Sequence, residues 1–305
     1  MAFSIRILGS SAATPTTRRN PSSILINMDY TYFLMDCGEG TQLQIRRYKV
    51  KLQRIKHIFI SHLHGDHFFG LVGLISTFHL LGRKDELHVY GPAQLKEIIN
   101  IQLRASQTQL IFPLHFHYTS PDEPQTVFES DEHYVKSFPL NHRIETTGFV
   151  FGEKLKPRKI KKSFLFFDEE ISVEDILKVK AGDDFVSKSG KVYENKDITE
   201  DPPVPASFAY CSDTRYYEPV IESVRKADIL YHEATFMDKM RHVAEEKYHA
   251  TAKQAALIAK QAEVGKLVLG HFSARYRELD ELLAEARSVF PNTELAIDGV
   301  THEIR

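Results

Sequence analysis

The residues best suited to chemistry lie in the run Ser61-His62-Leu63-His64-Gly65-Asp66-His67. His62, His64, Asp66 and His67 offer imidazole nitrogens and a carboxylate, which are donor types that zinc prefers. The run follows apolar residues 57–60, which predicts a loop at the carboxyl end of a strand, with Gly65 allowing a sharp turn. We expect two metal ions here, with His62 and His64 on one and Asp66 and His67 on the other.

Two ions need more donors than this loop provides, and three other strand ends supply them. His142, Asp213 and His271 each follow an apolar run, at 135–138, 208–210 and 267–269. Ligands at the same end of several strands come together in space. Alone, His142 or His271 would be interpreted as a structural histidine, but beside this loop each is predicted to be a ligand. Asp213 has two oxygens and can bridge both ions.

Three residues are candidates for proton transfer. His249 lies just before Thr251 and Gln254, which have the spacing of a capping box on a helix predicted over Ala252–Ala262. A helix N-terminus suits a phosphate, so His249 is our candidate acid, and a surface residue beside a cap is the alternative. Glu233 can hold its imidazole, as a carboxylate orients a catalytic histidine. Two metal ions can hold a water molecule between them as a nucleophile, and Asp66 can hydrogen-bond this water and help to deprotonate it.

Short apolar strands alternate with amphipathic helices along the chain, which predicts an α/β or α+β sandwich. Strands are predicted at 5–8, 23–26, 32–35, 58–61, 88–90, 135–138, 148–151, 207–210, 229–231, 266–269 and 295–297. Helices are predicted at 70–80, 94–103, 218–225, 252–262 and 279–289.

Composition narrows the class of protein. The chain has 305 residues, 42% of them hydrophobic, and a formal net charge of −2, so any nucleic-acid binding must come from a local basic patch. We expect no signal peptide and no membrane span, because no apolar stretch approaches roughly 18 residues. Cys37 and Cys211 suggest no disulfide framework. These features predict a cytoplasmic protein.

One stretch, 153–205, interrupts the pattern and predicts an insertion into a catalytic domain of residues 1–152 and 206–305. It opens on EKLKPRKIKK and closes on the proline-rich EDPPVP. The alternative is an ordinary charged surface loop. Its opening carries six basic residues suited to phosphates: Lys154, Lys156, Arg158, Lys159, Lys161 and Lys162.

Several motifs resemble those of the metallo-β-lactamase superfamily and, more closely, the short form of the ribonuclease Z family. They are MDCGEGTQLQ (35–44), SHLHGDHFFGLVGL (61–74), FPLNH (138–142), YCSDTR (210–215), HEATF (232–236), HATA (249–252) and HFSARY (271–276). The resemblance covers essentially the whole chain. It implies a four-layer αββα sandwich with an inserted, protruding arm that binds tRNA.

The resemblance also implies the activity. It predicts an endoribonuclease that removes the 3′ trailer of precursor tRNA by hydrolysing a phosphodiester, leaving a 3′-hydroxyl on the tRNA and a 5′-phosphate on the trailer. It implies two Zn²⁺ per subunit, with Mn²⁺ or another divalent ion as the alternative, and a homodimer. The first ion would take His62, His64, His142 and Asp213, and the second Asp66, His67, Asp213 and His271.

The resemblance to the family's RNA-contacting segments is less complete. Pro15–Asn20 resembles a loop that rejects tRNA already carrying CCA, with Thr17 in place of its lysine, so Arg18, Arg19 and Asn20 are expected to meet the RNA. Thr41 and Gln42 lie in a segment that lines the family's site. The rival functions are another phosphodiesterase or arylsulfatase-like hydrolase of the superfamily, and a catalytically silent RNA-binding scaffold, against which the complete ligand set argues.

Overall fold

The computed structural model describes residues 3–165 and 171–304. Its contacts divide the chain into two compact units. The catalytic unit comprises Met1–Glu129, His133–Gly152 and Ala206–Arg305, and the second unit, called the insert below, comprises Ser130–Glu132 and Glu153–Pro205.

Two seven-stranded sheets form the catalytic unit. The first sheet has the spatial order β18 (Thr301–Glu303), β1 (Phe3–Gly9), β2 (Ser23–Met28), β3 (Thr31–Met35), β4 (Ile55–Phe59), β5 (Leu87–Gly91) and β6 (Leu114–Tyr118). The second has the order β17 (Thr293–Leu295), β16 (Lys266–Gly270), β15 (Ile229–Glu233), β14 (Ser207–Cys211), β9 (Thr147–Glu153), β8 (His133–Pro139) and β7 (Gln125–Glu129). Strands β3 to β6 run parallel, as do β14 to β17.

Alternate side chains along each strand enter different cores, because successive residues point to opposite faces of a sheet. On β3, Phe33 and Met35 join the core between the sheets, whereas Leu34 packs on the outer face. Between the sheets, the Phe59 ring stacks on Tyr90, with ring centroids 4.4 Å apart. Both faces of the first sheet are therefore buried.

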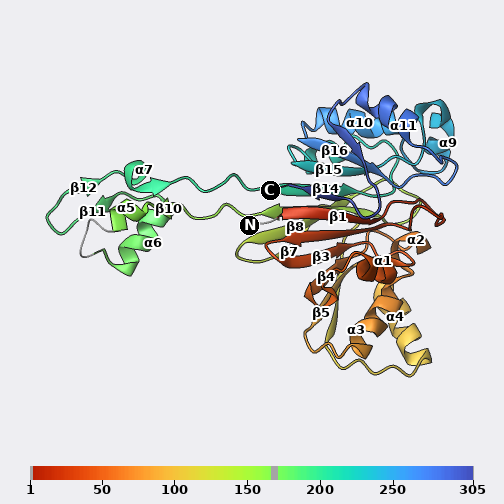
Figure 1. Ribbon diagram of the computed structural model, residues 1–305, viewed down its shortest axis with the longest axis horizontal. Coiled ribbons are helices and arrows are strands. Elements are labelled where there is room, and N and C mark those ends of the chain that lie inside the picture. Colours follow the sequence, from red (N-terminus) through yellow and green to blue (C-terminus); the bar gives the residue numbers. More distant parts are fainter. Residues whose placement is uncertain (1–2, 166–170, 305) are drawn as a thin grey trace. The chain divides into compact units, whose positions relative to one another are not determined.

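Helices cover both outer faces (Figure 1). α1 (Thr41–Arg47), α3 (Leu71–Leu80) and α4 (Gln94–Ala105) share a core with the outer face of the first sheet. α10 (Ala252–Gln261) and α11 (Asp280–Arg287) lie on the second. The predicted αββα sandwich is confirmed. Among the described residues, no helix is long and apolar enough to cross a membrane.

Some predicted boundaries were wrong for local reasons. Strand β4 ends at Phe59, two residues before the predicted end, because the Ser61 N–H donates to the Asp36 carboxylate at 2.8 Å. The helix predicted over 218–225 shortens to α8 (Val220–Ser223). The predicted strand at 295–297 lies instead at β17. The apolar patterns missed β6, β7, β18, α1, α2 (Gly65–Phe68) and α9 (Arg241–Glu246).

The insert has a small core of its own, formed by Ile160, Phe164, Val179, Phe185 and Ile198. Its elements are β10 (Lys159–Ile160) paired with β13 (Thr199–Glu200), β11 (Phe185–Val186) paired with β12 (Val192–Tyr193), and helices α5 (Lys162–Leu165), α6 (Val173–Ala181) and α7 (Asn195–Ile198). A capping box between Ser172 and Asp175 starts α6, and Gly182 ends it in a left-handed conformation. These contacts make 153–205 an ordered unit among the described residues.

Candidate metal-binding active site

The metal-ligand motif spans a loop and the first turn of a helix. His62 and His64 lie in the loop after β4, whereas Asp66 and His67 lie in α2. Gly65 begins α2, directly after the loop, and its backbone is not in the left-handed region. A side chain there would meet the Phe69 ring, with a Cβ only 2.2 Å from one ring carbon, so Gly65 serves close packing.

Four donor atoms form a first group at the ends of β4, β8 and β14. His64 Nδ1 lies 3.1 Å from His62 Nε2 and 3.2 Å from His142 Nε2. Asp213 Oδ2 lies 3.6 Å from His62 Nε2 and 3.8 Å from His142 Nε2. Tetrahedral ligands with bonds of about 2.1 Å are about 3.4 Å apart, so this group is close to the dimensions of a zinc site.

A second group of four donors uses the other oxygen of Asp213. Its Oδ1 lies 3.1 Å from His271 Nε2 and 3.4 Å from His67 Nε2. Asp66 Oδ2 lies 3.3 Å from His271 Nε2 and 3.4 Å from His67 Nε2, and these two nitrogens are 3.3 Å apart. The structure thus brings all seven predicted ligands together, with Asp213 between the two groups.

The charges of this cluster suit divalent cations. Burial lowers the pKa of the His62 imidazole well below its usual value, so it is neutral and can bind metal. Burial also opposes a charge on His67, but Asp66, Asp213 and Asp36 outweigh it and raise the pKa of His67 well above its usual value. Buried carboxylates here attract positive charge, and a metal ion would provide it in place of a proton.

The second ring nitrogen of most of these histidines has a partner that fixes the ring. His67 Nδ1 lies 2.7 Å from Asp36 Oδ2, His142 Nδ1 lies 2.9 Å from the Tyr248 carbonyl, and His271 Nδ1 lies 2.9 Å from Thr235 Oγ1. Such partners orient a metal-binding imidazole and set its tautomer. The sequence interpretation treated Asp36 as a buried structural carboxylate and did not single out Thr235. In the sequence, Asp36 lies in the MDCGEG motif and Thr235 in the HEATF motif, and these motifs could have identified both residues.

Glu233 contacts both His249, the predicted acid, and Thr235. Its Oε1 lies 2.8 Å from His249 Nδ1, and its Oε2 accepts from the Thr235 hydroxyl at 2.7 Å. Burial alone would lower the pKa of His249, but the Glu233 carboxylate and its hydrogen bond raise it to about 9. His249 therefore carries a proton near neutral pH. The predicted capping box between Thr251 and Gln254 is confirmed at the start of α10.

A cleft of about 300 Å³ opens over the cluster. His64, Asp66, Asp213, His249 and His271 line its floor. Three exposed cations line the same cleft: Arg143, Lys247 and Arg275. An anionic substrate would thus meet metal ligands, a proton donor and positive charge together.

The loop of residues 15–20 lies beside this cleft, but its side chains differ in role. The Arg18 side chain is 71% exposed and pairs with Glu278 at 3.0 Å. Arg19 is buried and donates to the Tyr276 carbonyl at 2.7 Å, so it holds the loop. Asn20 donates through its backbone and side chain to Asp298 Oδ2, at 2.8 and 2.9 Å. Of these three residues, Arg18 is the one exposed to solvent.

Thr41 and Gln42 have contacts inside the protein. Thr41 is buried, and its hydroxyl donates to the Gly38 carbonyl at 2.8 Å. Gln42 hydrogen-bonds the Thr77 hydroxyl. Both residues therefore shape the start of α1 and its packing on α3.

The basic residues of the insert are partly engaged within it. Arg158 pairs with Asp201 and donates to Thr199 Oγ1 at 2.7 Å. Lys159 Nζ lies 3.8 Å from Glu200, and Lys161 Nζ donates to the Asp197 carbonyl at 2.7 Å. Lys154 and Lys156 are half-buried, and Lys162 is exposed.

Known proteins similar to this chain share its whole length. A sequence model of the family described as anti-Pycsar protein Apyc1 matches residues 3–171, and a beta-lactamase superfamily domain model matches 204–272. A ribonuclease Z from Cytophaga hutchinsonii is 46% identical, covering 98% of this chain and 95% of the relative. A ribonuclease Z from Bacteroides fragilis is 44% identical, covering 98% of each.

A solved structure extends the likeness to three dimensions. The short form of human tRNase Z is 28% identical, covers 99% of each chain and superposes with a TM-score of 0.71. The similarity covers both the sandwich and the strand ends that carry the donor cluster. The chain belongs to the ribonuclease Z family.

Proposed function

We propose that this chain is a metal-dependent endoribonuclease that removes the 3′ trailer from precursor tRNA. The observation that carries the proposal is the cluster of seven donor residues beside the hydrogen-bonded pair of His249 and Glu233, with a cleft opening over them. Membership of the ribonuclease Z family supplies the substrate class. A silent scaffold would not need this constellation.

Two zinc ions suit the donor groups, because the first offers four nitrogen and oxygen atoms near tetrahedral spacing, and the second offers three, two of which Asp213 Oδ1 also approaches. His62, His64, His142 and Asp213 would hold one ion, and Asp66, His67, Asp213 and His271 the other. When bound, such ions supply Lewis acidity for the phosphate oxygens and lower the pKa of water towards 7. Mn²⁺ or another divalent ion is the alternative occupant.

The protein's own groups complete the reaction. Asp66 orients the attacking water and accepts its proton, while the Ala13 N–H holds Asp66 Oδ2 at 2.7 Å. Water forms the new bond to phosphorus, and the bond from phosphorus to the 3′ oxygen of the tRNA breaks. His249 donates its proton to that leaving oxygen, and Glu233 steadies the imidazole. The phosphate stays on the trailer.

The deciding experiment maps the cut. Purified protein with added Zn²⁺ is incubated with a precursor tRNA bearing a 3′ trailer, and both new ends are identified. We expect a 3′-hydroxyl at the discriminator nucleotide and a 5′-phosphate on the trailer. Cleavage of small phosphodiesters with no cut in precursor tRNA would instead favour another hydrolase of the superfamily.

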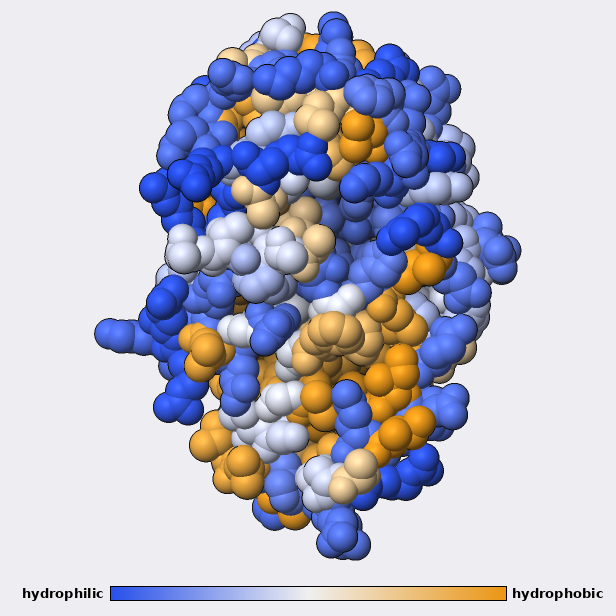
Figure 2. Space-filling model, turned by 90° about the vertical axis from the view of Figure 1, so that its right-hand side faces the viewer, coloured by the Kyte–Doolittle hydropathy of each residue, from blue (hydrophilic) through white to orange (hydrophobic). Residues whose placement is uncertain are grey.

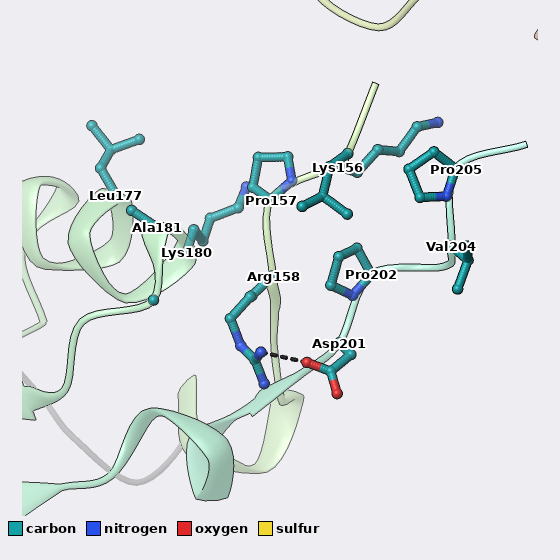
Figure 3. Close-up of a pocket in the computed structure, with 12 residues that line it drawn as sticks. Lys156, Pro157, Arg158, Leu177, Lys180, Ala181, Asp201, Pro202, Val204 and Pro205 are labelled. Carbon is teal, nitrogen blue, oxygen red and sulfur yellow. Dashed lines mark hydrogen bonds and ion pairs between the residues drawn. The ribbon is translucent and has the colours of Figure 1, made fainter. Parts of the chain in front are cut away.

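The insert is proposed to hold the tRNA away from the cut. Its segment 153–205 carries eleven basic and twelve acidic residues, so the binding of phosphates needs a local basic face. A hollow of about 810 Å³ is lined by the cations Lys156, Arg158 and Lys180, and Figure 3 shows Arg158 paired there with Asp201. The lysines there suit the phosphates of an RNA backbone.

A homodimer is proposed from the surface of the catalytic unit. Figure 2 shows apolar surface gathered over its lower half, where Figure 1 places α1, α3 and α4. On these helices, Leu43 of α1, Leu80 of α3 and Ile101 of α4 are exposed, with Leu80 80% accessible. Apolar patches of this kind mark protein interfaces. Analytical ultracentrifugation should show a dimer that Leu80→Asp weakens, and a monomeric parent at micromolar concentration would overturn the proposal.

A further inference from the structure

Helix α9 ends in a Schellman turn that delivers His249 to the cleft. The His249 N–H donates to the Ala244 carbonyl at 2.8 Å, and the Tyr248 N–H to the Glu245 carbonyl at 3.3 Å. Tyr248 takes the left-handed conformation, with φ of 60°. Glycine usually occupies this position because a side chain is strained there. A tyrosine therefore needs contacts that offset the strain.

The conformation of Tyr248 also orients a metal ligand. Its carbonyl accepts from His142 Nδ1 at 2.9 Å, which leaves Nε2 facing the first donor group, 3.2 Å from His64 Nδ1. The next residue in the chain is His249, the proton donor. One strained peptide unit thus links a metal ligand to the acid.

Arg215 holds the ring of Tyr248 in place. Its guanidinium lies 3.5 Å from the centre of the ring, and its Nε donates to the Glu245 carbonyl at 2.7 Å. Its backbone N–H donates to the carbonyl of Asn141, the residue before His142, at 2.9 Å. Arg215 thereby joins the end of β14, the loop that carries His142 and the end of α9.

We propose that Arg215 and Tyr248 form a clamp that positions the metal ligand His142 and the proton donor His249 relative to each other. The inference rests on the proposed function for its kinetic consequence. Both are positioning residues, because their contacts join protein segments and act on the reaction only through His142 and His249. The clamp therefore supports the cleavage step more than the binding of RNA.

The test compares kcat and KM on precursor tRNA for Tyr248→Gly, Arg215→Ala and the parent. Glycine accepts the left-handed backbone, so Tyr248→Gly removes the ring without opposing the turn. We expect kcat to fall by about 10–100-fold in both variants, with KM changed by less than about threefold. Tyr248→Phe keeps the ring and should recover most of the loss. Arg241→Ala removes an exposed arginine of α9 and is the matched control for Arg215→Ala.

A second readout does not depend on RNA. Retention of zinc against a chelator should weaken by about 10–100-fold in Tyr248→Gly, because His142 loses its orientation. Parental kcat in both clamp variants would overturn the proposal. A rise in KM alone would do the same and would make Arg215 an RNA contact. If the parent itself left precursor tRNA uncut, the proposed function would fail, and zinc retention would still test the clamp.

Discussion

Replacing Asp36 with Asn should disable the second donor group through His67. Asp36 Oδ2 accepts from the Ser61 and Tyr210 hydroxyls, at 2.9 and 2.7 Å, and lies 2.7 Å from His67 Nδ1. Its Oδ1 accepts from the Ser61 N–H at 2.8 Å. Every partner presents a donor, and an amide has one oxygen. In either orientation its NH₂ group faces a buried donor.

The expected magnitude follows from that mismatch. If the NH₂ group faces His67, the ring must change tautomer and place its proton on Nε2, the atom that faces the metal. Loss of such a partner typically weakens metal affinity by about 10–100-fold, or about 1.4–2.7 kcal/mol. We therefore expect the ion of the second donor group, which contains His67, to be lost first from Asp36→Asn during titration with a chelator.

The assay holds free zinc at a series of buffered concentrations and measures the zinc bound per chain at each one by mass spectrometry. Asp228→Asn is the matched control, because Asp228 also accepts from a backbone N–H, that of Ser207 at 2.7 Å, but at the opposite end of β14 from Asp213. Thermal unfolding checks that both variants are folded. Parental affinity for both ions in folded Asp36→Asn would refute the argument.

Four other changes test the site and the insert. His249→Ala should lower the rate on precursor tRNA by about 10²–10⁴-fold without loss of metal, and by less on a nitrophenyl ester, whose leaving group needs no acid; equal losses would point to phosphate positioning. Activity should fall as pH rises through the pKa of His249, which is about 9 without metal and lower beside bound cations. Glu233→Gln should move that fall to lower pH, because it removes the carboxylate that raises the pKa of His249. Replacing Glu153–Pro205 by a Gly/Ser linker should leave the hydrolysis of small phosphodiesters intact and raise KM for precursor tRNA. The salt dependence of tRNA binding should lose about 0.9 in slope per lost phosphate contact, and an unchanged slope would show that the insert does not bind tRNA. Arg18→Ala should improve cutting of trailers that follow CCA if this loop excludes them, and an unchanged ratio of CCA to non-CCA cleavage would remove that role.

The donor cluster was predictable because each of its residues follows an apolar strand and has a side chain with few alternative uses there. His142, Asp213 and His271 are far apart in sequence, yet parallel strand ends bring such residues to one edge. The pair of His249 and Glu233 was accessible for a similar reason, since the capping box located the start of α10. Pattern and chemistry agreed at these positions.

Other features depend on tertiary contacts that no local pattern encodes. Asp36 looks like any buried carboxylate in sequence, and its partner His67 is 31 residues away. Arg18 and Arg19 are adjacent and chemically alike, but one is exposed and the other is buried beneath the loop. Tyr248 follows α9 at a position where glycine is usual, and its partner Arg215 comes from the end of β14.

The most direct test of the account measures precursor-tRNA cleavage against the number of zinc ions bound per chain. Protein stripped with a chelator is reloaded in steps, and metal content and initial rate are determined on the same samples. The two donor groups joined by Asp213 predict little activity up to one ion and a steep rise as the second site fills. In Asp213→Ala, we expect neither full loading nor cleavage. Full activity at one ion per chain, or parental turnover in Asp213→Ala, would contradict the account.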